Sequence, residues 1–162
     1  MEAKIIELAP KQLVGMHLSM SMTDNKTGEL WRTFMPRRRE VANRVDNNFI
    51  SMQVYKTGEQ NHFVPTTSFE KWAVVEVSDV SDIPDGMESY HLQGGTYAVF
   101  EHHGPANLFP KTMHFIFGEW MPKSGYELDD REHFEVLGEG YDPIDANARE
   151  EIWIPVRKIV SS

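Results

Sequence analysis

Hydrophobic and polar residues alternate with period two along several segments of the chain, a pattern that predicts strands with one buried face. Residues 13–22 show it most clearly, because Val14, Met16, Leu18 and Met20 alternate with glycine or polar residues. Similar short runs predict strands over residues 4–8, 49–55, 69–77, 90–93, 96–103, 132–137 and 150–160. Gly94-Gly95 fits a hairpin turn between two of these strands. Pro155 fits an edge or bulge position in the last strand.

Two segments have helical periodicity instead. Thr27 fits a helix cap and is followed by Leu30, Trp31 and Phe34, although Pro36 interrupts the pattern and allows only a short or kinked helix to about residue 41. After Gly104-Pro105, one helical stripe continues to Met121-Pro122, where we expect the helix to end. This stripe consists of Leu108, Phe109, Met113, Ile116, Phe117 and Trp120.

Short matches relate the two halves of the chain. Phe34-Met35-Pro36 matches Trp120-Met121-Pro122, Met52-Gln53-Val54-Tyr55 matches Phe134-Glu135-Val136-Leu137, and Glu70-Lys71-Trp72 matches Glu151-Ile152-Trp153. The matches are collinear and lie about half a chain length apart, which indicates an internal duplication. We therefore predict an α+β fold of two strand–helix–strand–strand repeats, about 1–80 and about 88–160, in one domain spanning 1–162. The antiparallel sheets and two main helices would have pseudo-two-fold symmetry around a central cleft, a common place for a small ligand.

Composition narrows the class of protein. The 162 residues carry a formal net charge of −9 and no cysteine, so disulfides, thiolate metal sites and cysteine nucleophiles are excluded. Acidic charge disfavours direct nucleic-acid binding, and no apolar run is long enough for a membrane span. Metal-binding motifs, a nucleophile elbow and a phosphate-binding glycine loop are all missing from the sequence. We expect a cytoplasmic protein without a metal or other cofactor.

Glu151 is the residue that points most directly to chemistry. Alternation places Glu151 and Trp153 on one face of their strand and Ile152 and Ile154 on the other. If the isoleucines join the core, Glu151 faces either solvent or the cleft. A cleft carboxylate beside an indole would attract a lipophilic cation, since cation–π attraction contributes about 0.5–2 kcal/mol. Other aromatic residues could line the same cleft or simply pack in the core, with Trp72 the best cleft candidate; these are Trp120, Trp72, Tyr55, Phe109 and Tyr90.

The second half resembles the GyrI-like effector-binding family, the small-molecule-binding domain of multidrug-responsive transcription activators. The resemblance rests on Tyr97-Ala98-Val99-Phe100-Glu101-His102-His103-Gly104, on Trp120-Met121-Pro122-Lys123-Ser124-Gly125-Tyr126, on His133-Phe134-Glu135-Val136 and on Glu151-Ile152-Trp153-Ile154-Pro155-Val156. It implies two repeats around a cleft, with a buried glutamate, Glu151, meeting cationic lipophilic ligands and Trp153 lining the site. Leu137 stands where the family often has tyrosine, so Tyr55 of the first half is expected to supply the phenol. No DNA-binding segment precedes the match, so we expect a stand-alone member.

Three functions remain open from the sequence. The first is a receptor or sequestering protein for hydrophobic, often cationic, small molecules, bound by Glu151, Trp153, Trp120, Trp72, Tyr55 and Tyr90. The second is a hydrolase of reactive cyclic xenobiotics, with Glu151 as general base and Tyr55 or Trp120 positioning the substrate. The third is a protein partner that regulates gyrase or a separate transcription factor.

Overall fold

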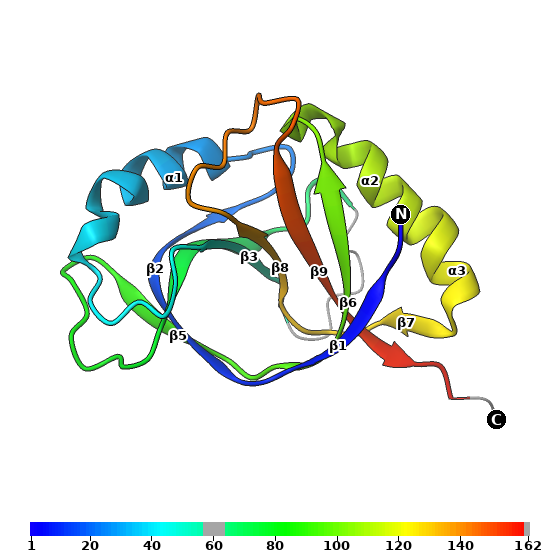
Figure 1. Cartoon of the computed structure of the whole chain (residues 1–162), viewed down its shortest axis with the longest axis horizontal. Helices are drawn as coiled ribbons and strands as arrows, with labels where there is room; N and C mark the ends of the chain where they lie inside the picture. The colour runs from blue at the N-terminus through cyan, green and yellow to red at the C-terminus, as the bar shows by residue number, and fades with distance from the viewer. Residues whose placement is uncertain (57–63, 161–162) are drawn as a thin grey trace.

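The chain forms one curled antiparallel sheet with helices on its outer face (Figure 1). The structure, a computed structural model, describes residues 1–56 and 64–160. Within these residues the strands are β1 (Lys4–Leu8), β2 (Lys11–Met20), β3 (Phe49–Val54), β4 (Phe69–Val77), β5 (Glu88–Leu92), β6 (Gly95–His103), β7 (Tyr126–Leu128), β8 (His133–Leu137) and β9 (Arg149–Lys158). Their order is β1-β6-β9-β8-β3-β4-β2-β5, and β7 pairs with β9. The predicted α+β class with two main helical segments is confirmed.

Each helical segment covers one half of the outer face. The helix α1 (Thr27–Phe34) continues into the 3₁₀ helix η1 (Met35–Glu40), and Leu30 and Phe34 pack on β2 and β4. The second segment consists of η2 (Ala106–Leu108), α2 (Phe109–Phe115), the π-helical turn η3 (Ile116–Trp120) and α3 (Met121–Ser124). Ile116 packs with Phe100 of β6 and with Ile152 and Ile154 of β9. The two helical segments therefore leave the inner face of the sheet uncovered by helices (Figure 1).

The inner face carries a row of side chains that crosses the sheet. Residues directly opposite each other in antiparallel strands share a face. Following the register from β2 to β6 gives the row His17, Trp72, Met52, Phe134, Trp153 and Val99. A buried cluster containing Leu13, Val74, Leu92 and Tyr97 extends this row. We call this surface the inner face, and its aromatic character comes from the period-two pattern of the strands.

Three local predictions are corrected by the structure. Gly94-Gly95 is not a hairpin turn, because β5 pairs with β2 whereas β6 pairs with β1 and β9. Gly94, at φ +85°, crosses so close to the Leu8 carbonyl that a Cβ would collide with it, and the chain there passes from one half of the sheet to the other.

The other two corrections concern prolines. The strand β9 is not an edge strand, because it pairs with β6 on one side and with β8 and then β7 on the other. Pro155 sits where the partner changes from β8 to β7, so its missing N–H interrupts neither of these two pairings. The second helical segment does not end at Met121-Pro122 but runs to Ser124, because Pro122 lies in the first turn of α3 directly after the π-helical turn.

Candidate functional site

Aromatic side chains gather on the inner face around two tryptophans. Phe134 stacks on Trp153 with ring centroids 5.2 Å apart and an interplanar angle of 15°. Tyr97 meets Phe134 and Trp153 edge-on at 5.3 and 5.9 Å. Toward the other end of the row, the rings of Trp72 and Tyr90 are in contact, with centroids 5.2 Å apart. Tyr97, Phe134 and Trp72 are buried in this packing, whereas Trp153 and Tyr90 stay half-buried.

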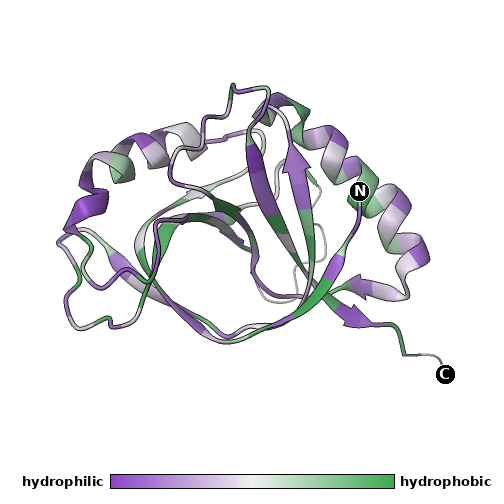
Figure 2. Ribbon diagram, viewed as in Figure 1, coloured by the Kyte–Doolittle hydropathy of each residue, from purple (hydrophilic) through white to green (hydrophobic). Residues whose placement is uncertain are grey.

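Glu151 lies at the edge of this aromatic surface. The strand β9 is hydrophilic at its start, hydrophobic in its middle and hydrophilic again at its end (Figure 2). The Glu151 side chain is exposed, and Trp153 Nε1–H donates a hydrogen bond of 3.1 Å to its carboxylate. The indole therefore orients the carboxylate without neutralising its charge.

A second carboxylate stands directly opposite the first. Glu101 of β6 pairs in register with Glu151, and like charges placed so repel each other. Glu101 is partly compensated, with Arg149 Nη1 at 3.7 Å and His103 Nε2 at 3.1 Å from its carboxylate.

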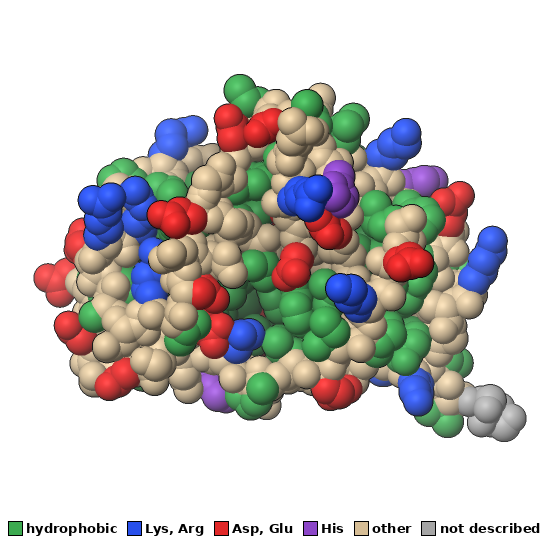
Figure 3. Space-filling view, viewed as in Figure 1, with side chains coloured by type: hydrophobic (Ala, Val, Ile, Leu, Met, Phe, Trp, Pro, Cys, Tyr) green, Lys and Arg blue, Asp and Glu red, His purple; other side chains and the backbone are tan. Residues whose placement is uncertain are grey.

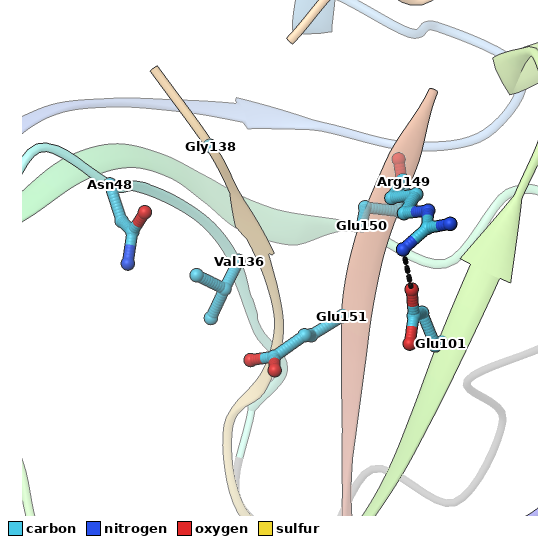
Figure 4. A pocket seen from close by; sticks show the side chains of 7 residues that line it. All are labelled: Asn48, Glu101, Val136, Gly138, Arg149, Glu150 and Glu151. Carbon is cyan, nitrogen blue, oxygen red and sulfur yellow. Dashed lines mark ion pairs between the residues drawn. The ribbon is translucent and has the colours of Figure 1, made fainter. Parts of the chain in front are cut away.

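A pocket of about 280 Å³ opens at these carboxylates. Figure 4 shows the Glu151 side chain pointing toward Val136 of β8, while Glu101 and Arg149 lie together on the other side of β9. The space-filling view shows a hollow in the middle of this face, with hydrophobic side chains on its floor and both acidic and basic side chains around it (Figure 3). The lining residues are Asn48, Glu101, Val136, Gly138, Arg149, Glu150 and Glu151.

Two tyrosine hydroxyls on the inner face donate hydrogen bonds to Glu132. Tyr90 donates to the Glu132 carboxylate at 2.6 Å, and Tyr97 donates to the Glu132 carbonyl at 2.9 Å. Burial and this carboxylate raise the pKa of both phenols above the ordinary value. Both therefore stay neutral and serve as fixed apolar walls.

The structure brings together four of the six predicted binding residues. Trp153, Trp72 and Tyr90 lie with Glu151 on the inner face. Trp120 does not, because it packs on the outer face against Phe100 at 5.1 Å. Phe109 also lies on the outer face, beside His102.

Tyr55 is likewise separated from Glu151. Its ring contacts Phe69 and His133 at 5.3 and 5.6 Å, and burial together with the charge of Glu135 raises its pKa to about 12. In register, His133 and Glu135 flank Phe134 and thus belong to the outer face. The expected pairing of Glu151 with Tyr55 is therefore wrong, and so is the expectation that Glu151 is buried.

The buried charges of the sheet were not predicted. Lys71 and Glu135 are 7% and 8% exposed on the outer face, between the areas covered by the two helical segments. Gln53, oriented to satisfy the network, accepts from Lys71 Nζ at 3.3 Å and donates to Glu135 Oε2 at 3.1 Å. The sequence does contain a sign of this pair. Lys71 and Glu135 are charged residues at strand positions where the alternating pattern predicts an apolar residue.

The described residues offer no cluster of three or more His, Asp or Glu side chains that could hold a metal ion. None of the helices in the described part of the chain is long and apolar enough to span a bilayer.

Comparison with known proteins identifies relatives over nearly the whole chain. The model of the GyrI-like small molecule binding domain matches residues 1–157. The transcriptional regulator BrlR of Pseudomonas aeruginosa is 28% identical over 157 residues, which are 96% of this chain and 56% of that protein, so the chain spans about half of its relative.

Solved structures share the fold at lower identity. The structure of SAV2435 bound to tetraphenylphosphonium has a TM-score of 0.69 at 17% identity and covers 97% of this chain and 94% of that one. The EcmrR C-terminal domain has a TM-score of 0.72 at 15% identity and covers 98% of each chain.

Proposed function

The chain belongs to the GyrI-like small molecule binding domain family, and on this premise we propose that it binds hydrophobic organic cations on the inner face of its sheet. Glu151 is the anionic anchor, and Trp153 with Phe134 forms the aromatic wall beside it. One observation carries the proposal. The Glu151 carboxylate accepts a hydrogen bond from Trp153 and stands directly opposite Glu101 in the sheet. A neutral ligand would leave that repulsion in place, whereas a cation removes it.

The balance of energies favours a large apolar cation over a small hydrated one. The half-buried Trp153 indole offers cation–π attraction of about 0.5–2 kcal/mol, and apolar contact adds about 25 cal/mol for each Å² removed from water. A small inorganic cation would gain neither and would have to give up its hydration shell. SAV2435, which shares the fold, is bound to tetraphenylphosphonium, a cation of the expected class.

The short sequence matches between the two halves fit a site in the middle of the sheet. Met52 pairs with Phe134, and these two residues are counterparts in the matched halves. Trp72 and Trp153, also counterparts, lie one strand outward on either side. We propose that the two repeats meet at β3 and β8 and that the ligand lies over this junction.

We further propose that binding serves effector sensing or sequestration rather than turnover. The regulator BrlR, at 28% identity, supports a sensing role. The hydrolase alternative loses one of its expected residues, because Tyr55, the tyrosine expected to work with Glu151, lies on the other face of the sheet. A gyrase or transcription-factor partner and a stand-alone role stay predictions.

Titration with tetraphenylphosphonium, followed by tryptophan fluorescence and calorimetry, tests the proposal. We expect saturable binding to the wild type and a loss of about 1–2 kcal/mol, roughly 5–30-fold in Kd, in Glu151→Gln. Glu119→Gln is the matched control, because it removes the same charge from an exposed position on the outer-face helix. Absence of saturable binding to the wild type, or equal affinities of the two variants, would refute it.

A further inference from the structure

The first half of the inner face repeats the arrangement of Glu151 and Trp153. On β4, Glu70 precedes Trp72 by two residues, just as Glu151 precedes Trp153 on β9. Two residues along a strand return to the same face, so each wall has a carboxylate next to an indole. We call Glu70 and Trp72 the first wall, and Glu151 and Trp153 the second wall.

The two walls differ in the residue opposite the tryptophan. On the second wall, Val99 of β6 stands opposite Trp153. On the first wall, His17 of β2 stands opposite Trp72. The His17 ring is stacked on the indole, with centroids 4.2 Å apart and an interplanar angle of 22°. A heteroaromatic side chain of this protein therefore covers the face of Trp72.

Both nitrogens of His17 face carboxylates. Its Nδ1 lies 2.8 Å from Glu70 Oε2, and its Nε2 is hydrogen-bonded to the carboxylate of Glu88 on β5. An ionised carboxylate can only accept a hydrogen bond, so both contacts are attractive only if both ring nitrogens carry hydrogen. With both carboxylates ionised, this geometry favours an imidazolium, a planar organic cation held between an indole and two carboxylates.

The surroundings of His17 stabilise this charge. Partial burial by itself would lower the pKa of His17, but hydrogen bonds to Glu70 and Glu88 and the charges of both groups outweigh it and raise the pKa above the ordinary value. Glu70 from β4 and Glu88 from β5 are the charged groups that contact it among the described residues. Tyr90 packs on Trp72 from β5, with its hydroxyl donated to Glu132.

We propose that the first wall is a second subsite for planar organic cations and that protonated His17 is the internal cation that fills it. The inference rests on the proposed function, since it assigns to the first wall the chemistry proposed for the second. The His17 side chain is 32% exposed, so the subsite is reachable from solvent once the ring moves. An external cation competes with His17 there, and the competition becomes easier as pH rises and His17 loses its proton.

Removing the internal cation should create a measurable site. In His17→Ala, imidazole at about pH 6, below the ordinary histidine pKa of about 6.5, supplies the same cation from solution. The readout is the indole N–H cross-peak of Trp72 in two-dimensional NMR, assigned with Trp72→Phe. We expect a saturable shift in His17→Ala and a response at least tenfold weaker in the wild type.

Two variants serve as controls. His17→Ala/Glu70→Gln keeps the vacated space but removes the carboxylate, and we expect it to lose the imidazole response. Val99→Ala opens the equivalent space at the second wall and should leave the Trp72 signal unresponsive. Circular dichroism checks that each variant folds. The single variant Glu70→Gln, which keeps His17, should also lower the pKa of His17. Titration of the His17 ring protons by NMR measures this pKa.

The outcomes separate this inference from the proposed function. It is overturned if imidazole produces no saturable shift in folded His17→Ala, if the wild type responds equally, or if removal of Glu70 changes neither the response nor the pKa of His17. Tetraphenylphosphonium binding is measured on the wild type, in which His17 covers Trp72, and it therefore reports on the second wall. A wild type that fails to bind it contradicts the proposed function whatever the imidazole result.

Discussion

Replacing Lys71 with methionine should destabilise the fold, and the loss should grow as pH rises. Lys71 and Glu135 are both buried, and Gln53 lies between them. Removing one partner of a buried pair leaves the other charge uncompensated, which typically costs about 3–5 kcal/mol. For 162 residues each kcal/mol corresponds to about 3 °C in Tm, so the expected decrease is about 9–15 °C at pH 8.

The pH dependence follows from the state of Glu135. Burial raises the pKa of this carboxyl in the folded protein, and the positive charge of Lys71 counteracts part of the increase. Without Lys71 the folded pKa rises further, whereas the unfolded chain loses the proton near the ordinary value of about 4.3. Because the folded state then binds more protons, stability is greatest below the unfolded pKa and falls as pH rises through the folded one.

Urea unfolding of wild type and Lys71→Met at pH 5 and pH 8 measures both effects. The double variant Lys71→Met/Glu135→Leu is the control, because replacing both charges with apolar side chains should return the stability to within about 1 kcal/mol of the wild type. A Lys71→Met protein as stable as the wild type at pH 8, or equally destabilised at both pH values, would refute the reasoning.

Two further predictions concern the two faces of the sheet. Trp120→Phe should leave the Kd for tetraphenylphosphonium within twofold of the wild type, because Trp120 packs against Phe100 on the outer face; a tenfold weaker affinity by calorimetry would place it in the site. Phe34→Ala should lower the free energy of unfolding by about 3–5 kcal/mol, because Phe34, the last residue of α1, is fully buried between this helix and the sheet. Urea unfolding measures this loss, and one below 1 kcal/mol would contradict the packing described for that helix.

The sequence pattern was sufficient to predict which residues of a strand share a face. Alternation correctly separated Glu151 and Trp153 from Ile152 and Ile154, because the period of a strand is independent of its partners. The family resemblance was also confirmed, since its motifs lie in contiguous segments.

Pairing between distant strands could not be predicted in the same way. The sequence does not place Glu101 opposite Glu151 or His17 opposite Trp72, because each pair is fixed by the register of strands far apart along the chain. Gly94-Gly95 has the composition of a hairpin turn but joins two strands with other partners. Tyr55 was assigned to the site by analogy with its counterpart in the other half, and its position just beyond the end of β3 turns it toward His133.

The central claim is that the cation lies on the inner face, held by Glu151. A crystal structure of the chain with tetraphenylphosphonium tests it most directly. The account predicts a phenyl ring against Trp153 and the phosphorus within about 6 Å of the Glu151 carboxylate. A cation found instead on the outer face, beside the buried carboxylates of Glu135 and Glu150, would contradict it.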